Sequence, residues 1–342
     1  MPLARRYRAD RIFEKRQLRG EWLTDTLDGR VTSKDGNRYG QVFANRGYFA
    51  TVYPMDTKSK AGDALRTFCQ EFGVPDRLTC DGSKEQTGKK TEFMQQVRKN
   101  DIDLHVIEPE RHNQNPCEGV IREVRRKWFR TMVRSRVPRK FWDYGMRWVC
   151  EVMQRTSTQA GGLNGCTPIE SVTGETTDIS EYLDFGFYDS VWYHENAGLG
   201  ERLPGRWLGV SHRVGSLMSY YVLTGKCTVI SRTTVQRVTN LELQVDSNKL
   251  LYKEFDKEVR RILGEEEPQQ DIGDKPSPED WAEFMEFDED FQEEFSNIVS
   301  NDDIKEADDE FTPEVFDDTY LNMELALPSG DGAKPAFARV TK

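Results

Sequence analysis

Residues 80–119 read CDGSKEQTGKKTEFMQQVRKNDIDLHVIEPERHNQNPCEG, and this stretch decides how the chain folds. Asp81 directly follows a short apolar run, and Glu118 opens a long stretch with helical spacing. The pattern places two carboxylates, far apart in sequence, where the end of a strand can meet the start of a helix. Upstream, Asp25 lies in another strand-like run and supplies a third carboxylate. This arrangement suits a metal site.

The segments around this stretch alternate between strand and helix patterns. The predicted strands cover 22–27, 40–43, 48–53, a run that ends at 81, and 102–107. The predicted helices cover 58–72, 90–99, 115–137 and 139–156, and residues 81–88 are predicted to form a loop. The order β-β-β-α-β-α-β-α is typical of a mixed α/β sheet of five strands.

A different pattern begins after residue 161. Short strand-like runs recur through 185–245, and one pair is joined by a turn at 224–226. We therefore expect a basic arm (1–20), an α/β core (21–160), a connector (161–184), a small β-barrel-like module (185–245) and an acidic, mostly disordered tail (246–342).

Charge divides the 342-residue chain into two parts. Residues 264–342 hold 25 Asp and Glu against 5 Lys and Arg, whereas residues 1–263 hold 34 against 43. The basic part fits a polyanionic partner, although a charge surplus is also found on ordinary solvated surfaces. The chain has no apolar run near the ~18 residues that a membrane span needs. Its six cysteines form no CxxC pair, which argues against a structural zinc site.

The three carboxylates point to divalent-cation chemistry. Asp25, Asp81 and Glu118 could hold two Mg²⁺ or Mn²⁺ ions about 3.5–4 Å apart, one on an attacking oxygen and one on the leaving oxygen of a phosphodiester. Spacing alone makes this a weak signal, because the chain has 59 acidic residues. An Asp at a strand end is also a common turn former or helix cap.

A longer series of residues strengthens the interpretation. In order it comprises Leu65, Phe72, Gly73-Val74-Pro75, Asp81, Glu85, Thr91-Glu92-Phe93, Pro109, His112-Asn113-Gln114-Asn115, Glu118, Thr167-Pro168-Ile169-Glu170, Gly174, Asp178-Ile179-Ser180, Phe185-Gly186 and the segment 209–237. Over roughly residues 20–245 the chain resembles the integrase of copia-type (Ty1/copia) long-terminal-repeat retrotransposons. The resemblance implies an RNase H-like fold and a D,D,E catalytic set, carried here by Asp25, Asp81 and Glu118.

Three features depart from that family pattern. The family usually has Asn-Gly-Gly after the second Asp, where this chain has Gly82-Ser83-Lys84. Asp28 is an alternative to Asp25 as the first ligand. The family's His-His-Cys-Cys zinc module is not found ahead of the core, so we expect the chain to be a fragment of a longer polyprotein.

Basic residues follow Glu118 along the predicted helix. Arg122 and Arg125 fall four and seven residues after Glu118 and so share its face, and Arg126, Lys127 and Arg130 extend the charge. One interpretation is a solvated helix face. The resemblance implies instead that these residues hold a DNA end by its phosphates.

The resemblance implies an enzyme that joins element-end DNA to host target DNA. A catalytically inactive relic that acts as a DNA-binding or scaffold protein is the main alternative, and an RNase H-type nuclease is a third. We expect a homo-oligomer, a nuclear location after a cytoplasmic particle stage, and no membrane. In the tail, an aromatic stripe of Trp281, Phe284, Phe287, Phe291 and Phe295 predicts a helix that folds on a chromatin-associated host protein or on the chain's own DNA-binding face.

Overall fold

The computed structural model describes residues 16–107, 118–158, 162–176, 178–195, 201–212, 214, 218–265, 324–327 and 336–339. The chain divides into two compact units, residues 1–276 and 277–342. Within the described residues, every helix is too short or too polar to cross a membrane.

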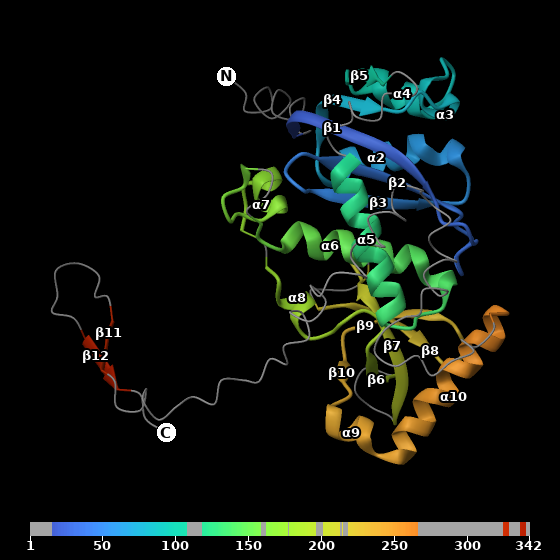
Figure 1. Cartoon of the computed structure of the whole chain (residues 1–342), viewed down its shortest axis with the longest axis vertical. Helices are drawn as coiled ribbons and strands as arrows, with labels where there is room; N and C mark the ends of the chain where they lie inside the picture. The colour runs from blue at the N-terminus through green and yellow to red at the C-terminus, as the bar shows by residue number, and fades with distance from the viewer. Residues whose placement is uncertain are drawn as a thin grey trace, which may run out of the picture. The chain divides into compact units, whose positions relative to one another are not determined.

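The first unit contains a mixed five-stranded sheet in the order β3-β2-β1-β4-β5 (Figure 1). Its strands are β1 (Gln17–Asp28), β2 (Tyr39–Asn45), β3 (Ala50–Met55), β4 (Val74–Cys80) and β5 (Asp103–Val106). Strand β2 is antiparallel to both β1 and β3, while β1, β4 and β5 pair in parallel. Only β2 therefore runs against the other four, which is the topology of the RNase H-like fold, as predicted.

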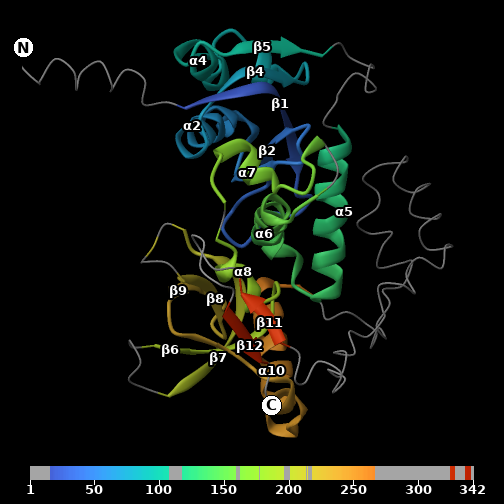
Figure 2. The ribbon, with the colours of Figure 1, turned by 90° about the vertical axis from the view of Figure 1, so that its left-hand side faces the viewer.

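Helices cover both faces of this sheet, and Figure 2 shows α2 and α5 on opposite sides of it. On one side lie η2 (Lys58–Lys60), α2 (Ala61–Glu71) and α4 (Glu92–Lys99). Trp22 of β1 and Phe43 of β2 pack there against Phe68 of α2, with ring centroids 5.2 and 4.5 Å apart. Because strand side chains alternate, the neighbours of Trp22 along β1 point to the other face.

That other face is covered by α5 (Glu118–Arg134) and by α6 (Trp142–Arg155), which follows the short η4 (Arg139–Phe141). Leu23 and Leu27 of β1 are buried on it. Gly40, which pairs with Leu27, lies against the Trp142 ring. The indole of Trp128 in α5 donates to the Trp142 carbonyl at 3.1 Å, which joins the two helices.

The connector contains α7 (Pro168–Thr173) and α8 (Ser180–Leu183) and leads to a second sheet. This sheet has the order β10-β6-β7-β8-β9, with β6 (Ser190–His194), β7 (Arg202–Val210), β8 (Tyr220–Thr224), β9 (Val229–Arg232) and β10 (Val235–Arg237), all antiparallel. The predicted turn at 224–226 does join β8 to β9. Trp207 and Tyr220 are buried in the core of this β-rich module.

The prediction that an acidic tail begins at residue 246 is wrong at its start. Two helices, α9 (Asn240–Gln244) and α10 (Asp246–Leu263), continue the ordered chain. Tyr252, Phe255, Val259 and Leu263 recur at helical spacing on α10 and are buried. The 18 residues of α10 carry four acids against five bases, so the acidic composition starts only after this helix.

The loop predicted at 81–88 is also partly wrong, since Lys84–Thr87 form one helical turn, α3. In the second unit, β11 (Glu324–Leu327) and β12 (Ala336–Arg339) pair in antiparallel fashion. Most of the basic arm, the aromatic stripe and the part of the predicted tail between residues 266 and 323 lie outside the described residues.

Candidate active site at the ends of β1 and β4

The parallel pairing of β1 with β4 determines where the first two carboxylates lie. Leu23 pairs with Thr79 and Thr24 with Cys80, so Asp25 and Asp81 are the next positions in register. Residues paired in register point to the same face of a sheet. Asp25, on β1, and Asp81, directly after β4, therefore lie next to each other on the same face of the sheet, the one that α5 and α6 cover.

Helix α5, which comes later in the chain than both aspartates, covers this face of the sheet. Its first residue is Glu118, whose side chain lies outside the described part of the structure. Two turns further along α5, the Arg125 Nη2 atom lies 3.6 Å from Asp25 Oδ2. This ion pair shows that the Arg125 side chain reaches from α5 to Asp25. Both side chains are about one-third exposed, so solvent reaches the pair.

Each aspartate is oriented by the backbone of the next residue. Thr26 N donates to Asp25 Oδ1 at 2.7 Å, and Gly82 N donates to Asp81 Oδ1 at 2.6 Å. Asp81 is exposed and takes no further hydrogen bond or ion pair from the described residues. Its carboxylate charge and, above all, burial raise the pKa of the neighbouring Cys80 thiol to about 12. That thiol stays protonated and is no nucleophile at neutral pH.

Carboxylate oxygens are the ligands that Mg²⁺ and Mn²⁺ prefer, so the donor set fits these ions. The structure brings together two of the three predicted ligands. A cluster of three or more His, Cys, Asp or Glu side chains that could hold a metal is not found within the described residues. The Glu118 carboxylate is outside that set.

Asp28, the alternative first ligand, lies elsewhere. It is three positions after Asp25 on β1, so it faces the opposite side of the sheet. Arg38 Nε lies 2.8 Å from Asp28 Oδ1, and Arg30 N donates to the same oxygen at 2.7 Å. Asp28 closes the β1–β2 turn and does not approach Asp81.

A buried polar chain supports the site from behind, and the sequence analysis missed it. Gln41 Nε2 donates to Thr24 Oγ1 at 2.5 Å, and Thr24 Oγ1 donates to Val42 O at 2.9 Å. Thr26 Oγ1 donates to Gln41 Oε1 at 2.8 Å, and Gln86 Nε2 donates to Thr26 Oγ1 at 3.4 Å. Gln86 belongs to α3, so the chain ties the segment after Asp81 to β1 on both sides of Asp25.

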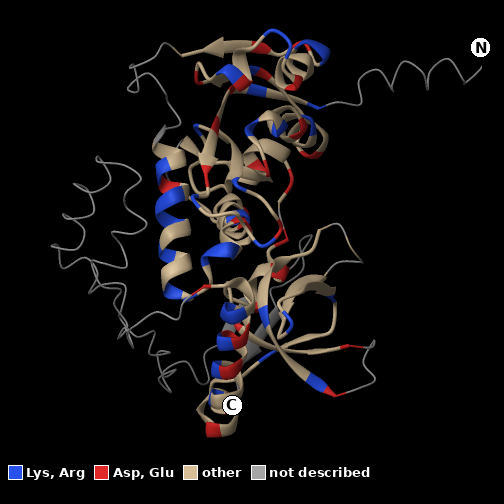
Figure 3. Cartoon of the chain, turned by 90° about the vertical axis from the view of Figure 1, so that its right-hand side faces the viewer, with Lys and Arg blue, Asp and Glu red and all other residues tan. Residues whose placement is uncertain are grey.

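The basic residues of α5 take different roles. Glu123 binds both Arg126, at 2.9 Å, and Lys127, at 3.5 Å. Burial, and then the charge of Arg126, lower the pKa of Arg130. Figure 3 shows Lys and Arg spread along α5, which carries few acids. The surface of α5 beyond Arg125 is therefore positive even where Glu123 neutralises part of it.

No known family model matches the chain, and no curated protein matches it. Solved structures do. The BIV integrase catalytic core domain is 12% identical with a TM-score of 0.33, covering 45% of this chain and 93% of its own. The HTLV-2 integrase catalytic core domain in complex with magnesium is 11% identical with a TM-score of 0.35, and the match covers 46% of this chain and 99% of that domain. A chain of the simian T-cell lymphotropic virus intasome in complex with the PP2A regulatory subunit B56 gamma is 12% identical with a TM-score of 0.34. That match covers 66% of this chain and 82% of the other. The fold assignment rests on the strand order itself.

Proposed function

We propose that this chain is the integrase of a copia-type long-terminal-repeat retrotransposon, a polynucleotidyl transferase that joins element DNA to host DNA. The observation that carries the proposal is the register of β1 and β4. It sets Asp25 beside Asp81 on the face crossed by α5, the helix that begins at Glu118.

In the proposed reaction the 3′-hydroxyl oxygen of the element end attacks a phosphorus atom of the target strand. The attacking hydroxyl loses its proton to solvent as the new P–O bond forms, the P–O3′ bond of the target breaks, and the departing 3′-oxygen takes a proton from solvent. Two Mg²⁺ or Mn²⁺ ions, held by Asp25, Asp81 and Glu118, would activate the attacking oxygen and stabilise the leaving one. No covalent enzyme intermediate is needed.

The remaining residues position the DNA. Arg122 and Arg125 project from the α5 turns that follow Glu118, where they can hold phosphates of the element end. Arg126, Lys127 and Arg130 extend this positive surface along the helix. The Gln86–Thr26 contact keeps the segment after Asp81 against β1, so that the two aspartates hold a constant spacing.

A strand-transfer assay tests the proposal. The substrates are short duplexes that carry element ends together with a plasmid target, incubated with Mg²⁺ and in parallel with Mn²⁺. Covalently joined products are expected. Their absence with both ions, for folded protein that still binds DNA, would reject the enzyme.

A second candidate is a catalytically inactive relic that binds DNA. The Asp25–Arg125 ion pair favours it, because a fixed guanidinium competes with divalent ions for the Asp25 carboxylate. Arg125→Ala separates the two. If Arg125→Ala binds DNA more weakly and neither it nor the unchanged protein joins DNA, the relic is supported. Joining by the unchanged protein supports the enzyme.

The partners follow from the same reaction. An element has two ends, so we propose a homo-oligomer that presents at least two active sites to element-end and target DNA. We propose that the protein acts in the nucleus, where it would meet target DNA, after a cytoplasmic particle stage. The aromatic stripe of the acidic tail is proposed to bind a chromatin-associated host protein.

A further inference from the structure

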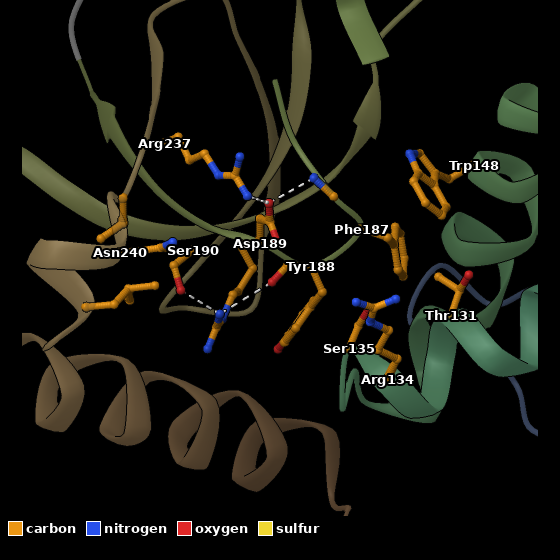
Figure 4. A pocket seen from close by; sticks show the side chains of 14 residues that line it. Thr131, Arg134, Ser135, Trp148, Phe187, Tyr188, Asp189, Ser190, Arg237 and Asn240 are labelled. Carbon is orange, nitrogen blue, oxygen red and sulfur yellow. Dashed lines mark hydrogen bonds and ion pairs between the residues drawn. The ribbon is translucent and has the colours of Figure 1, made fainter. Parts of the chain in front are cut away.

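A cavity of about 560 Å³ lies between the last turn of α5 and the β-rich module (Figure 4). One wall comes from Thr131 and Arg134 of α5 and from Ser135, the residue that follows the helix. The other comes from the start of β6, from the end of β10 and from α9, with Arg237 and Asn240 among its side chains. None of these five residues belongs to the candidate active site.

The α5 wall offers donors that are not in use. Arg134 is exposed, and it makes no ion pair or hydrogen bond through its guanidinium with any described residue. The hydroxyls of Thr131 and Ser135 likewise have no side-chain partner among those residues. A guanidinium and two hydroxyls gathered at the end of a helix are typical of a phosphate-binding wall.

The opposite wall adds a second cation with a weak partner. The Arg237 Nη2 atom lies 3.4 Å from Asp189 Oδ2, an oxygen that also accepts from Gly186 N at 2.8 Å. The amide of Asn240 makes no side-chain hydrogen bond within the described chain. Figure 4 shows Arg237 and Arg134 approaching the cavity from opposite sides.

The third cation that lines the cavity is already neutralised. Arg206 binds Asp256 through two of its nitrogens and donates to Ser190 Oγ at 2.7 Å. The charge left for a ligand therefore comes from Arg134 and from Arg237, with Asp189 as the one lining carboxylate. That balance suits a single phosphodiester better than a highly charged anion.

We propose that this cavity receives a backbone phosphate of duplex DNA lying along α5. The inference rests on the proposed function, since it assumes that the DNA end is at Asp25 and Asp81. Arg126, Arg130 and Arg134 follow one another at four-residue intervals and mark the path from the site to the cavity. From Glu118, the proposed third ligand, to Arg134 the helix rises about 24 Å at 1.5 Å per residue. At 3.4 Å per base pair, this places the phosphate about seven base pairs from the reacting end.

The test compares DNA binding by unchanged protein, Arg134→Gln and Arg237→Gln, in EDTA so that no joining occurs. The probes are two blunt-ended duplexes of about 5 and about 16 base pairs, one shorter and one longer than the proposed path. An uncharged linker closes the far end of each duplex. The matched control is Arg66→Gln, which removes an exposed arginine, paired with Asp63, from the other side of the sheet.

With the longer duplex, each cavity variant is expected to lower the log–log salt slope by roughly 0.9 per lost phosphate contact. With the shorter duplex, the variants and unchanged protein should bind alike. The control should follow unchanged protein with both probes. Arg237→Lys, which keeps the charge, should restore part of the slope.

Equal slopes for all proteins on the longer duplex would overturn the proposal. An equal loss on both duplexes would also overturn it, because the contact would then lie near the end. Inorganic tripolyphosphate is the third probe, and binding that needs Arg134 without any length-dependent effect on DNA would assign the cavity to a free anion instead. None of these results depends on strand transfer, so the proposed function and this inference can fail separately.

Discussion

Asp25 and Asp81 lie close together because of the register between β1 and β4. Their surroundings differ. Asp25 is held by Arg125 from α5, whereas Asp81 faces solvent. A divalent cation carries twice the charge of a guanidinium, so it can displace Arg125 from Asp25.

The catalytic prediction concerns Asp81. Asp81→Asn should reduce strand transfer more than about a hundredfold, beyond the loss that an outer supporting residue causes, and leave DNA affinity nearly unchanged. Asp28→Asn is the matched control, because it removes a carboxylate from the same strand region on the opposite face. Gel quantification of joined products checks both. Full activity in Asp81→Asn, or loss only in Asp28→Asn, would contradict the assignment.

His212 gives a prediction about pH. Its Nε2 atom lies 3.1 Å from Glu151 Oε1, and Tyr182 Oη lies 3.3 Å from the same nitrogen. The hydrogen bond to Glu151 raises the pKa of His212, burial and the charge of Arg155 lower it, and the charges of Glu151 and Glu181 raise it, with a net upward shift.

A raised folded-state pKa means that the charged imidazolium stabilises the fold below the unfolded pKa and loses that effect as pH rises through the folded pKa. His212→Gln should therefore lower the Tm more at about pH 6 than at about pH 8.5, on either side of the usual histidine range. Calorimetry at both values measures this. His105→Gln, which removes an exposed histidine of β5, is the control for the loss of an imidazole. An equal Tm loss at both pH values in His212→Gln would contradict the ion pair.

At the scale of elements, α5 combines a buried stripe with a basic surface. Val120, Val124 and Trp128 are buried, while Arg122 lies on the exposed side. Amphipathic spacing alone predicts this division. Only packing shows that Arg125, seven residues from Glu118, ends beside Asp25.

The prediction for this element is a change in salt dependence. Arg122→Ala combined with Arg125→Ala should weaken binding of all duplex sequences similarly and lower the log–log salt slope by roughly 0.9 per lost contact. Lys60→Ala with Arg66→Ala removes equal charge near Asp63 on the other side of the sheet and should change little. Fluorescence anisotropy over a salt series measures the slope, and an unchanged slope would leave α5 as a solvated face.

Helix α10 shapes the first unit as a whole, because it contacts both the β-rich module and the core. Asp256 binds Arg206 of the module, and Tyr252 Oη donates to Val191 O at 2.8 Å. At its end, Glu265 accepts from the backbone nitrogens of Arg139 and Lys140 at 3.0 and 2.9 Å. The helix thus fastens the module to the turn after α5, beside the cavity.

Removing one of these contacts should destabilise the unit. Asp256→Ala leaves the mostly buried Arg206 without its carboxylate and should lower the free energy of unfolding by on the order of 2 kcal/mol. Glu258→Ala, on the same helix but in an exposed pair with Arg261, should have little effect. Urea denaturation compares the two, and equal stabilities would show that α10 does not depend on the Asp256 contact.

The acidic segment gives the last whole-molecule prediction. Truncation after Glu265 keeps the Glu265 contacts and removes all but one of the 25 acidic residues of 264–342, so it should tighten DNA affinity at low salt on the order of tenfold. The gain should fade as salt screens the charges. Replacing the five aromatics of the stripe by Ser keeps the charge, so it separates charge from aromatic docking. An unaltered Kd after truncation would leave only an external partner for this segment.

The sequence by itself determined the order of strands and helices in the core, since alternation and helical spacing are local properties of the chain. It also singled out Asp25, Asp81 and Glu118 and the basic turns after them.

Tertiary structure decided what local patterns cannot express. Register between β1 and β4 placed Asp25 beside Asp81, because the partner of a strand is not written in its own residues. Gln41 and Gln86 became a buried polar chain only when β2 and α3 met β1. Helix α10 was missed because its amphipathic stripe is stable only against the module that it covers. The cavity beside Arg134 and Arg237 exists only where two distant segments face each other.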